Sequence, residues 1–103
     1  MAEFDGKVAI VTGAGRLRGI GRATAVAMAR MGADVVVTGT GRDPATFPPD
    51  EKAVGWKDME GTAEQVRAAG SRALTLKVDV TDRDHVQMMF DRTLEEFGRL
   101  DIL

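Results

Sequence analysis

The sequence predicts an α/β fold: a doubly wound parallel sheet with helices on both faces, truncated at the start of its fourth strand. Two observations predict it. Short apolar runs of strand length alternate with segments of helical periodicity along the 103 residues. Parallel neighbours need crossover connections, which are right-handed, and the helical segments supply them. The length allows one domain, which we place at residues 1–103.

The first part of the chain supplies two strands and the helix between them. Residues 8–12 form a short apolar run that ends at a glycine, which is typical of a strand buried on both faces. Residues 20–31 repeat alanine and larger apolar side chains at helical spacing, and Gly32 is the expected C-terminal stop. Residues 35–38 are all β-branched, which predicts the second strand.

A proline-containing segment separates the second strand from the second helix. Residues 40–57 contain all three prolines and few apolar side chains, so we expect a surface loop there. Trp56, near the end of this segment, is expected to anchor the loop. Helical spacing resumes from Met59 to Val66 and predicts a helix that stops at Gly70.

The last part of the chain predicts a strand, a helix and the opening of a fourth strand. Residues 74–80 alternate in polarity, which places Asp79 near the carboxyl end of the third strand. Thr81 stands three residues before Asp84, so we expect the Thr81 hydroxyl to cap the next helix by accepting a backbone N–H. Residues 100–103 resemble the beginning of a strand.

Composition excludes several classes of protein. The chain has 14 basic and 16 acidic side chains and a formal net charge of −2, and it has no basic run that would mark a nucleic-acid surface. It contains no cysteine and one histidine, His85, which excludes a disulfide framework and a metal site of thiolates or imidazoles. No signal peptide is recognisable, and no stretch approaches the roughly 18 apolar residues of a membrane span. We expect a cytoplasmic protein without metal, nucleic-acid or membrane partners.

The most informative segment joins the first strand to the first helix. Residues 12–21 contain four glycines. Glycines permit a tight turn and let backbone N–H groups approach a pyrophosphate, while the helix N-terminus adds the positive end of its dipole. The strict G-x-G-x-x-G fingerprint is not met because Arg18 stands at its last position, and no Gly-Lys-Ser/Thr of a P-loop follows. The architecture resembles the first half of a Rossmann-like nucleotide-binding fold.

These motifs resemble the short-chain dehydrogenases/reductases. The glycine signature of that family is T-G-x-x-x-G-I-G, which Thr12-Gly13 and Gly19-Ile20-Gly21 match with two additional residues between them. The resemblance continues in segments 4–11, 79–82 and 97–103, so it covers nearly the whole chain apart from the proline-containing loop. The chain resembles the amino-terminal, cofactor-binding half of that family.

The resemblance also implies residue roles. Gly13, Gly19 and Gly21 would line the pyrophosphate, and Ile20 would contact the nicotinamide side. Asp79 would accept a hydrogen bond from the adenine amino group, and Val80 would pack on the adenine ring. We expect no metal and no catalytic residue within the chain. The expected cofactor site consists of Gly13, Arg16, Arg18, Gly19, Ile20, Gly21, Gly39, Thr40, Arg42, Asp79 and Val80.

The cofactor preference depends on the end of the second strand. An acid there hydrogen-bonds the adenosine ribose of NAD, whereas a basic side chain pairs with the 2′-phosphate of NADP. Gly39 stands where NAD-preferring relatives carry an acid, and Arg18 and Arg42 offer bidentate donors to a phosphate. NADP is therefore the preferred cofactor. NAD is the alternative, with Asp43 as the ribose acceptor.

The resemblance implies an NAD(P)-dependent oxidoreductase that transfers a hydride between a nicotinamide cofactor and a carbonyl or alcohol substrate. Family members use a serine and a Tyr-x-x-x-Lys pair, in which the tyrosine is the acid or base. The chain contains no tyrosine, so we expect it to be inactive alone. We also expect further polypeptide that completes the sheet, and a homo-oligomer. The alternative is a noncatalytic nucleotide-binding or regulatory module of the same fold.

Overall fold

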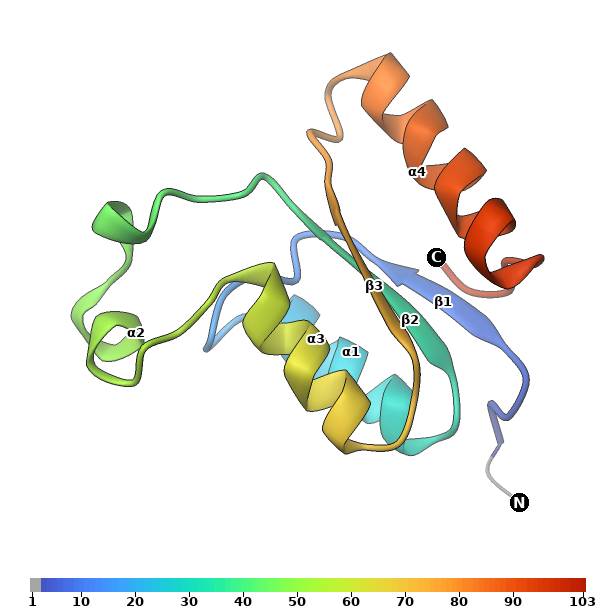
Figure 1. The fold of residues 1–103 in the computed structure, drawn as a ribbon, viewed down its shortest axis with the longest axis horizontal. Coiled ribbons are helices and arrows are strands. Elements are labelled where there is room, and N and C mark those ends of the chain that lie inside the picture. Colours follow the sequence, from blue (N-terminus) through green and yellow to red (C-terminus); the bar gives the residue numbers. More distant parts are fainter. Residues whose placement is uncertain (1–2) are drawn as a thin grey trace.

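A computed structural model describes residues 3–103 of the chain (Figure 1). Strands and helices alternate along these residues, which confirms the predicted α/β class. Short helical turns interrupt the alternation only between the second strand and the next long helix. The elements are β1 (Val8–Val11), α1 (Ile20–Arg30), β2 (Asp34–Gly39), the 3-10 turn η1 (Pro44–Thr46), α2 (Pro49–Ala53), α3 (Met59–Ala68), β3 (Ala73–Lys77) and α4 (Arg83–Phe97).

The sheet has three parallel strands in the order β1-β2-β3. β3 ends at Lys77, before the predicted residue 80, because its neighbour β2 ends at Gly39, the register partner of Lys77. On the other edge, Ile102 forms one parallel bridge with Ala9 of β1. The predicted fourth strand is therefore represented in the described residues by a single bridge. Because the strands are parallel, their carboxyl ends lie together at one edge of the sheet.

Helices cover both faces of the sheet, as predicted. In Figure 1, α1 and α3 lie on one face and α4 lies on the other. Successive strand residues point to opposite faces. Val35 and Val37 accordingly pack in one apolar cluster with Val66 of α3, while Val36 packs in another with Met89 of α4. The β-branched run that predicted the second strand thus fills two cores at once.

The prediction for the start of α4 is wrong about the capping residue. Asp82, not Thr81, is the N-cap, and its Oδ1 accepts hydrogen bonds from the backbone N–H groups of Asp84 at 2.9 Å and His85 at 3.3 Å. The Thr81 hydroxyl instead donates to Asp79 Oδ1 at 2.6 Å. Aspartate caps helices at least as well as threonine, and a hydroxyl bonds more strongly to a charged acceptor than to a neutral one.

The proline-containing segment 40–57 holds more regular structure than a loop. It includes η1 and α2, and in both of them a proline occupies the first turn, where its fixed φ favours a helical start. Asp43 caps η1 by accepting a hydrogen bond from the backbone N–H of Ala45 at 3.0 Å. Phe47 and Glu51 are buried, so the segment packs against the rest of the chain.

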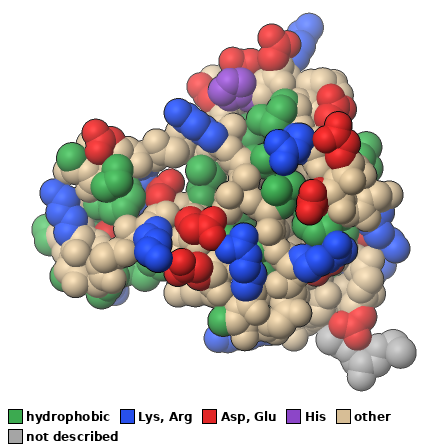
Figure 2. Space-filling model, in the orientation of Figure 1, with side chains coloured by type: hydrophobic (Ala, Val, Ile, Leu, Met, Phe, Trp, Pro, Cys, Tyr) green, Lys and Arg blue, Asp and Glu red, His purple; other side chains and the backbone are tan. Residues whose placement is uncertain are grey.

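On the face drawn in Figure 2, acidic and basic side chains alternate and form no continuous patch of one sign. Within residues 3–103, no helix combines the length and the apolar composition needed to cross a bilayer.

Candidate functional site

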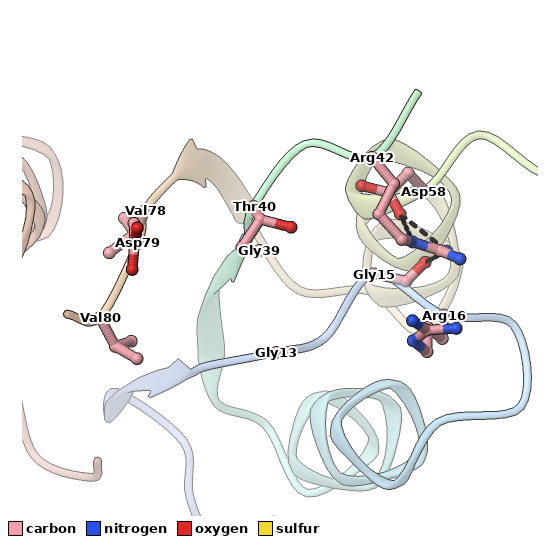
Figure 3. A pocket seen from close by; sticks show the side chains of 10 residues that line it. All are labelled: Gly13, Gly15, Arg16, Gly39, Thr40, Arg42, Asp58, Val78, Asp79 and Val80. Atoms are coloured by element: carbon pink, nitrogen blue, oxygen red, sulfur yellow. Dashed lines mark hydrogen bonds and ion pairs between the residues drawn. The ribbon is translucent and has the colours of Figure 1, made fainter. Parts of the chain in front are cut away.

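A pocket lies at the carboxyl ends of the three strands (Figure 3). Its floor comes from the turn after β1, and one side comes from the residues that follow β3. The end of β2 and the beginning of α3 complete it. The lining residues are Gly13, Gly15, Arg16, Gly39, Thr40, Arg42, Asp58, Val78, Asp79 and Val80. In open α/β sheets, ligands bind in the crevice outside the carboxyl ends of the strands, which is this place.

The glycine-rich turn needs its glycines for two physical reasons. Gly13 has a φ of +64°, a conformation that other residues rarely adopt. A Cβ atom at Gly21 would lie 2.7 Å from the carbonyl oxygen of Gly13 and 2.9 Å from Ala14 Cα, so only glycine lets α1 begin this close to the turn. The N-cap of α1, Gly19, makes no side-chain capping bond, and the first turn of the helix carries no acid. The backbone N–H groups at this terminus can therefore bind an anion.

The carbonyl oxygen of Gly15 is held by side chains from the proline-containing segment. Trp56 Nε1 donates a hydrogen bond to it at 2.6 Å, and Arg42 Nη2 donates a second at 3.3 Å. The carboxylate of Asp58 occupies the place of a Gly15 side chain, since a Cβ there would lie 2.7 Å from Asp58 Oδ1. The segment therefore fixes the middle of the glycine-rich turn.

Arg42 forms the centre of a charged cluster beside the pocket. Its Nη1 and Nη2 atoms donate to the two carboxylate oxygens of Glu51 at 3.0 and 2.9 Å, and its Nε donates to Asp58 Oδ1 at 2.9 Å. The ring of Phe47 lies under the guanidinium, 4.6 Å from its centroid. The hydrogen bond to Glu51 is the largest cause that raises the pKa of Arg42, so the guanidinium is charged, and all three of its nitrogen atoms donate to the two carboxylates.

Asp79 forms the opposite wall with its carboxylate ionised. Its Oδ1 accepts hydrogen bonds from the hydroxyl and the backbone N–H of Thr81, and these lower the pKa of Asp79. The backbone N–H of Asp79 donates to His85 Nδ1 at 3.0 Å, which fixes the turn after β3. Val80 beside it is 62 % exposed. An acceptor next to an exposed apolar side chain can bind a flat ring that carries a polar donor.

The structure brings together most of the predicted site residues. Around this pocket it gathers Gly13, Arg16, Gly39, Thr40, Arg42, Asp79 and Val80. Ile20 and Gly21 instead line a second hollow with the end of β1, and Ile20 is 86 % exposed there. Gly19 lies at the N-terminus of α1, outside the residues that line either hollow.

Arg18 does not line the pocket. Its side chain is 82 % exposed and donates to Asp50 of α2 at 2.6 Å. This hydrogen bond also lowers the pKa of Asp50.

Sequence reasoning missed the contributions of Gly15 and Asp58 to this pocket. Asp58 has a detectable local signal, since an aspartate directly before the helical spacing that starts at Met59 is typical of an N-cap. It is the N-cap residue of α3, but no helical N–H bonds to its side chain, which turns to Arg42 instead. Trp56 was predicted to anchor the loop, and its bond to Gly15 confirms this.

Nothing in the pocket resembles a metal centre. Across the described residues there is no group of three or more Asp, Glu or His side chains that could hold an ion. The polar groups are instead a turn of backbone N–H donors, the exposed Arg16, one ionised acceptor at Asp79, and a charge cluster in which Arg42 pairs with two carboxylates. This arrangement suits a ligand with a phosphate in its middle and a ring at one end.

Comparisons with known proteins agree with this geometry. A family model described as short chain dehydrogenase matches residues 7–103. A versicolorin reductase of Emericella nidulans is 42% identical over 101 residues, which cover 98% of this chain and 33% of that protein. A 12alpha-hydroxysteroid dehydrogenase of a Clostridium species is 37% identical over 107 residues, covering 100% of this chain and 36% of the relative. The chain thus spans about a third of the length of the relatives it matches.

Solved structures give the same result. A carveol dehydrogenase from Mycobacterium avium in complex with NAD matches with a TM-score of 0.78 and 31% identity, over 99% of this chain and 36% of that one. A short chain dehydrogenase from the same species matches with a TM-score of 0.80 and 37% identity, over 99% and 33% of the two chains. These similarities confirm the predicted Rossmann-like fold.

Proposed function

Because the chain belongs to the short chain dehydrogenase family, we propose that it is the cofactor-binding half of an oxidoreductase. This enzyme transfers a hydride between a nicotinamide dinucleotide and a carbonyl or alcohol substrate. The observation that carries the proposal is the pocket at the carboxyl ends of the strands, where the glycine-rich turn and the N-terminus of α1 meet. Two similar structures, from Mycobacterium avium and Mycobacterium paratuberculosis, contain NAD, which supports the same class of cofactor here.

The residues present fit such a cofactor. A Cβ at Gly21 would fill the space between α1 and the turn, and the absence of a side-chain cap leaves the first N–H groups of α1 available to a pyrophosphate. In this proposal Gly13 and Gly19 also face the pyrophosphate. Asp79 accepts a hydrogen bond from the adenine, and Val80 packs on its ring. The nicotinamide supplies the hydride chemistry when bound.

Ile20 is assigned to the nicotinamide side of the site. It lines the second hollow, which begins at the carboxyl end of β1 and includes Thr12 and Thr24. An exposed isoleucine at this place offers an apolar surface to one face of a ring. Its role is to orient the ring rather than to exchange protons.

Acid–base chemistry on the substrate is assigned to groups outside this chain. The family mechanism uses a tyrosine, and these 103 residues contain none. Hydride transfer is therefore proposed for the protein that carries this chain, together with a homo-oligomeric assembly and a cytoplasmic location. The chain itself is proposed to bind and position the cofactor.

Whether the site takes NADP or NAD depends on which side chains are free to bind the 2′-phosphate. Gly39, Arg18 and Arg42 favoured NADP on sequence, but a phosphate needs arginines that are free to pair with it. Arg18 is engaged with Asp50 outside the pocket, and Arg42 is engaged with Glu51 and with a second carboxylate. Asp43, the alternative ribose acceptor, caps η1 and does not line the pocket.

Turnover with a panel of substrates tests the proposed function. The protein that carries this chain is incubated with NAD or NADP and a series of secondary alcohols, and with the reduced cofactors and the matching ketones. The proposal predicts that the absorbance of the reduced nicotinamide changes with at least one combination of cofactor and substrate. Saturable cofactor binding without turnover on any pair would favour the noncatalytic module instead. Absence of binding would contradict both.

A further inference from the structure

The end of β2 carries no carboxylate, and Gly39 there packs closely against Met59 of α3. A Cβ at Gly39 would lie 3.1 Å from Cγ and 3.3 Å from Sδ of Met59. A carboxylate reaches the pocket from Asp58, the residue before Met59, which lies beside Arg42 and Gly15 (Figure 3). The N-terminus of α3 thus crowds the end of β2 and brings a carboxylate of its own, Asp58, to the pocket.

Asp58 is held with one oxygen turned to Arg42. Its Oδ1 accepts a hydrogen bond from Arg42 Nε at 2.9 Å and forms an ion pair with Arg42 Nη2 at 2.8 Å. Nothing within residues 3–103 donates a hydrogen bond to the other oxygen, Oδ2, and this atom is not among the buried unpaired ones. Asp58 adopts a φ of +56°, so its backbone conformation is unusual and its place depends on these contacts. It therefore keeps one acceptor available to a ligand hydroxyl.

We propose that Asp58 and Glu51, acting around Arg42, select a ribose 2′-hydroxyl over a 2′-phosphate, so that the site prefers NAD(H) to NADP(H). This inference rests on the proposed function and reverses the preference that the sequence suggested. One guanidinium and two carboxylates give the cluster a formal net charge of 1 − 2 = −1. A hydroxyl donates to such a cluster, whereas a phosphate placed against it is repelled. Arg16 also lines the pocket, but it is exposed and does not belong to the cluster.

Arg42 cannot turn to a phosphate without a penalty. The side chain of Glu51 is 2 % exposed, and both of its oxygens are bonded to Arg42. If Arg42 left, Glu51 would remain as a buried charge without a partner, which is strongly unfavourable. Glu51, an acid that sequence spacing did not reveal, thus retains the arginine that the sequence analysis assigned to the phosphate of NADP.

Equilibrium titrations with NADH and NADPH test this inference on the protein that carries the chain. We expect NADH to bind at least about tenfold more tightly than NADPH, because like charges in a partly desolvated site are costly. In Glu51→Gln, Arg42 gains freedom to pair with a phosphate, so NADPH affinity should rise about tenfold while NADH affinity changes little. In Asp58→Asn, which keeps the size of the side chain, NADH affinity should fall and the ratio of NADH to NADPH affinity should narrow.

Glu60→Gln is the matched control, because Glu60 is a half-exposed acid on α3 that pairs with Arg67. It should leave the NADH:NADPH ratio unchanged. Equal or tighter binding of NADPH by the unsubstituted protein would overturn the inference, and this measurement stands even if a variant fails to fold. A folded Glu51→Gln protein with an unchanged ratio would also overturn it. Binding of neither cofactor would overturn the proposed function itself, and this inference with it.

Discussion

Trp56 Nε1 and the carbonyl oxygen of Gly15 form a 2.6 Å hydrogen bond between residues that are 41 positions apart in the chain. The indole ring packs over α3, where a Cβ at Gly61 would lie 2.9 Å from ring carbons. Packing against α3 therefore fixes the indole ring, and the indole N–H in turn fixes the glycine-rich turn at Gly15. A binding loop that is ordered before its ligand arrives avoids part of the entropy cost of binding.

Trp56→Phe removes this hydrogen bond and keeps an aromatic ring. We expect NADH affinity to fall about fivefold, which corresponds to the roughly 1 kcal/mol of one hydrogen bond. Fluorescence titration measures the affinity, and thermal unfolding reports whether the fold is kept. Val54→Ala is the control, since Val54 lies in the same segment and is 66 % exposed. Unchanged affinity in Trp56→Phe would mean that the turn is held without the tryptophan.

Gly21→Ala should destabilise the protein. The added Cβ would lie 2.7 Å from the Gly13 carbonyl oxygen, which is backbone and cannot rotate away. Overpacking of this kind costs about 1–3 kcal/mol in the free energy of unfolding, measurable by urea denaturation. Ala23→Ser, on the exposed side of α1, should change it by less than about 0.5 kcal/mol. A Gly21→Ala protein as stable as the control would show that α1 does not need to approach the turn.

Asp79→Ala should weaken cofactor binding without unfolding the protein. The Asp79 side chain is exposed, and Thr81 keeps its carboxylate ionised and oriented. Loss of a hydrogen bond to a charged acceptor lowers affinity by about tenfold, and isothermal titration with NADH measures this loss. Asp84→Ala, also exposed at the start of α4, should bind normally. Equal losses in both variants would argue against a specific adenine contact at Asp79.

Acid should destabilise the contact between the end of the chain and β1. The Arg99 guanidinium and the backbone N–H of Val8 lower the pKa of Asp101 from 3.8 to about 2. Because the folded-state pKa is depressed, the stabilisation is complete above the ordinary value and is lost as the pH falls from 3.8 towards 2. Urea denaturation across this pH range should show a smaller decline in the free energy of unfolding for Asp101→Asn than for the unsubstituted protein. Equal declines in the free energy of unfolding of the two proteins would contradict the assignment of this stabilisation to Asp101.

Much of the fold was predictable because its determinants are local. The β-branched run at Val35, Val36 and Val37 specifies a strand buried on both faces, and the structure packs it in two cores. The glycine-rich turn was recognisable for the same reason, since the positive φ of Gly13 and the close approach of Gly21 to Gly13 both lie within the turn and the start of α1. Asp79 and Val80 followed from the order of motifs, and both line the pocket.

The rest of the site depends on contacts between distant residues. Neither Trp56 nor Asp58 lies near Gly15 in sequence, and only packing brings them to the turn. The ion pair of Arg42 with Glu51 could not be predicted, because sequence spacing does not distinguish a buried acid from a solvated one. At the start of α4, Thr81 and Asp82 are both acceptable caps, and tertiary context decided between them.

The central claim is that the turn between β1 and α1 binds the pyrophosphate of a nicotinamide dinucleotide, and an NADH titration of Gly19→Val beside the unsubstituted protein tests it most directly. Gly19 is the N-cap of α1, where the N–H groups of the first turn are proposed to bind the pyrophosphate, so we expect a valine side chain there to hinder the approach of the phosphates. We predict saturable binding by the unsubstituted protein and at least about tenfold weaker binding by the variant at a similar unfolding temperature. Equal affinity in the two folded proteins would contradict the claim.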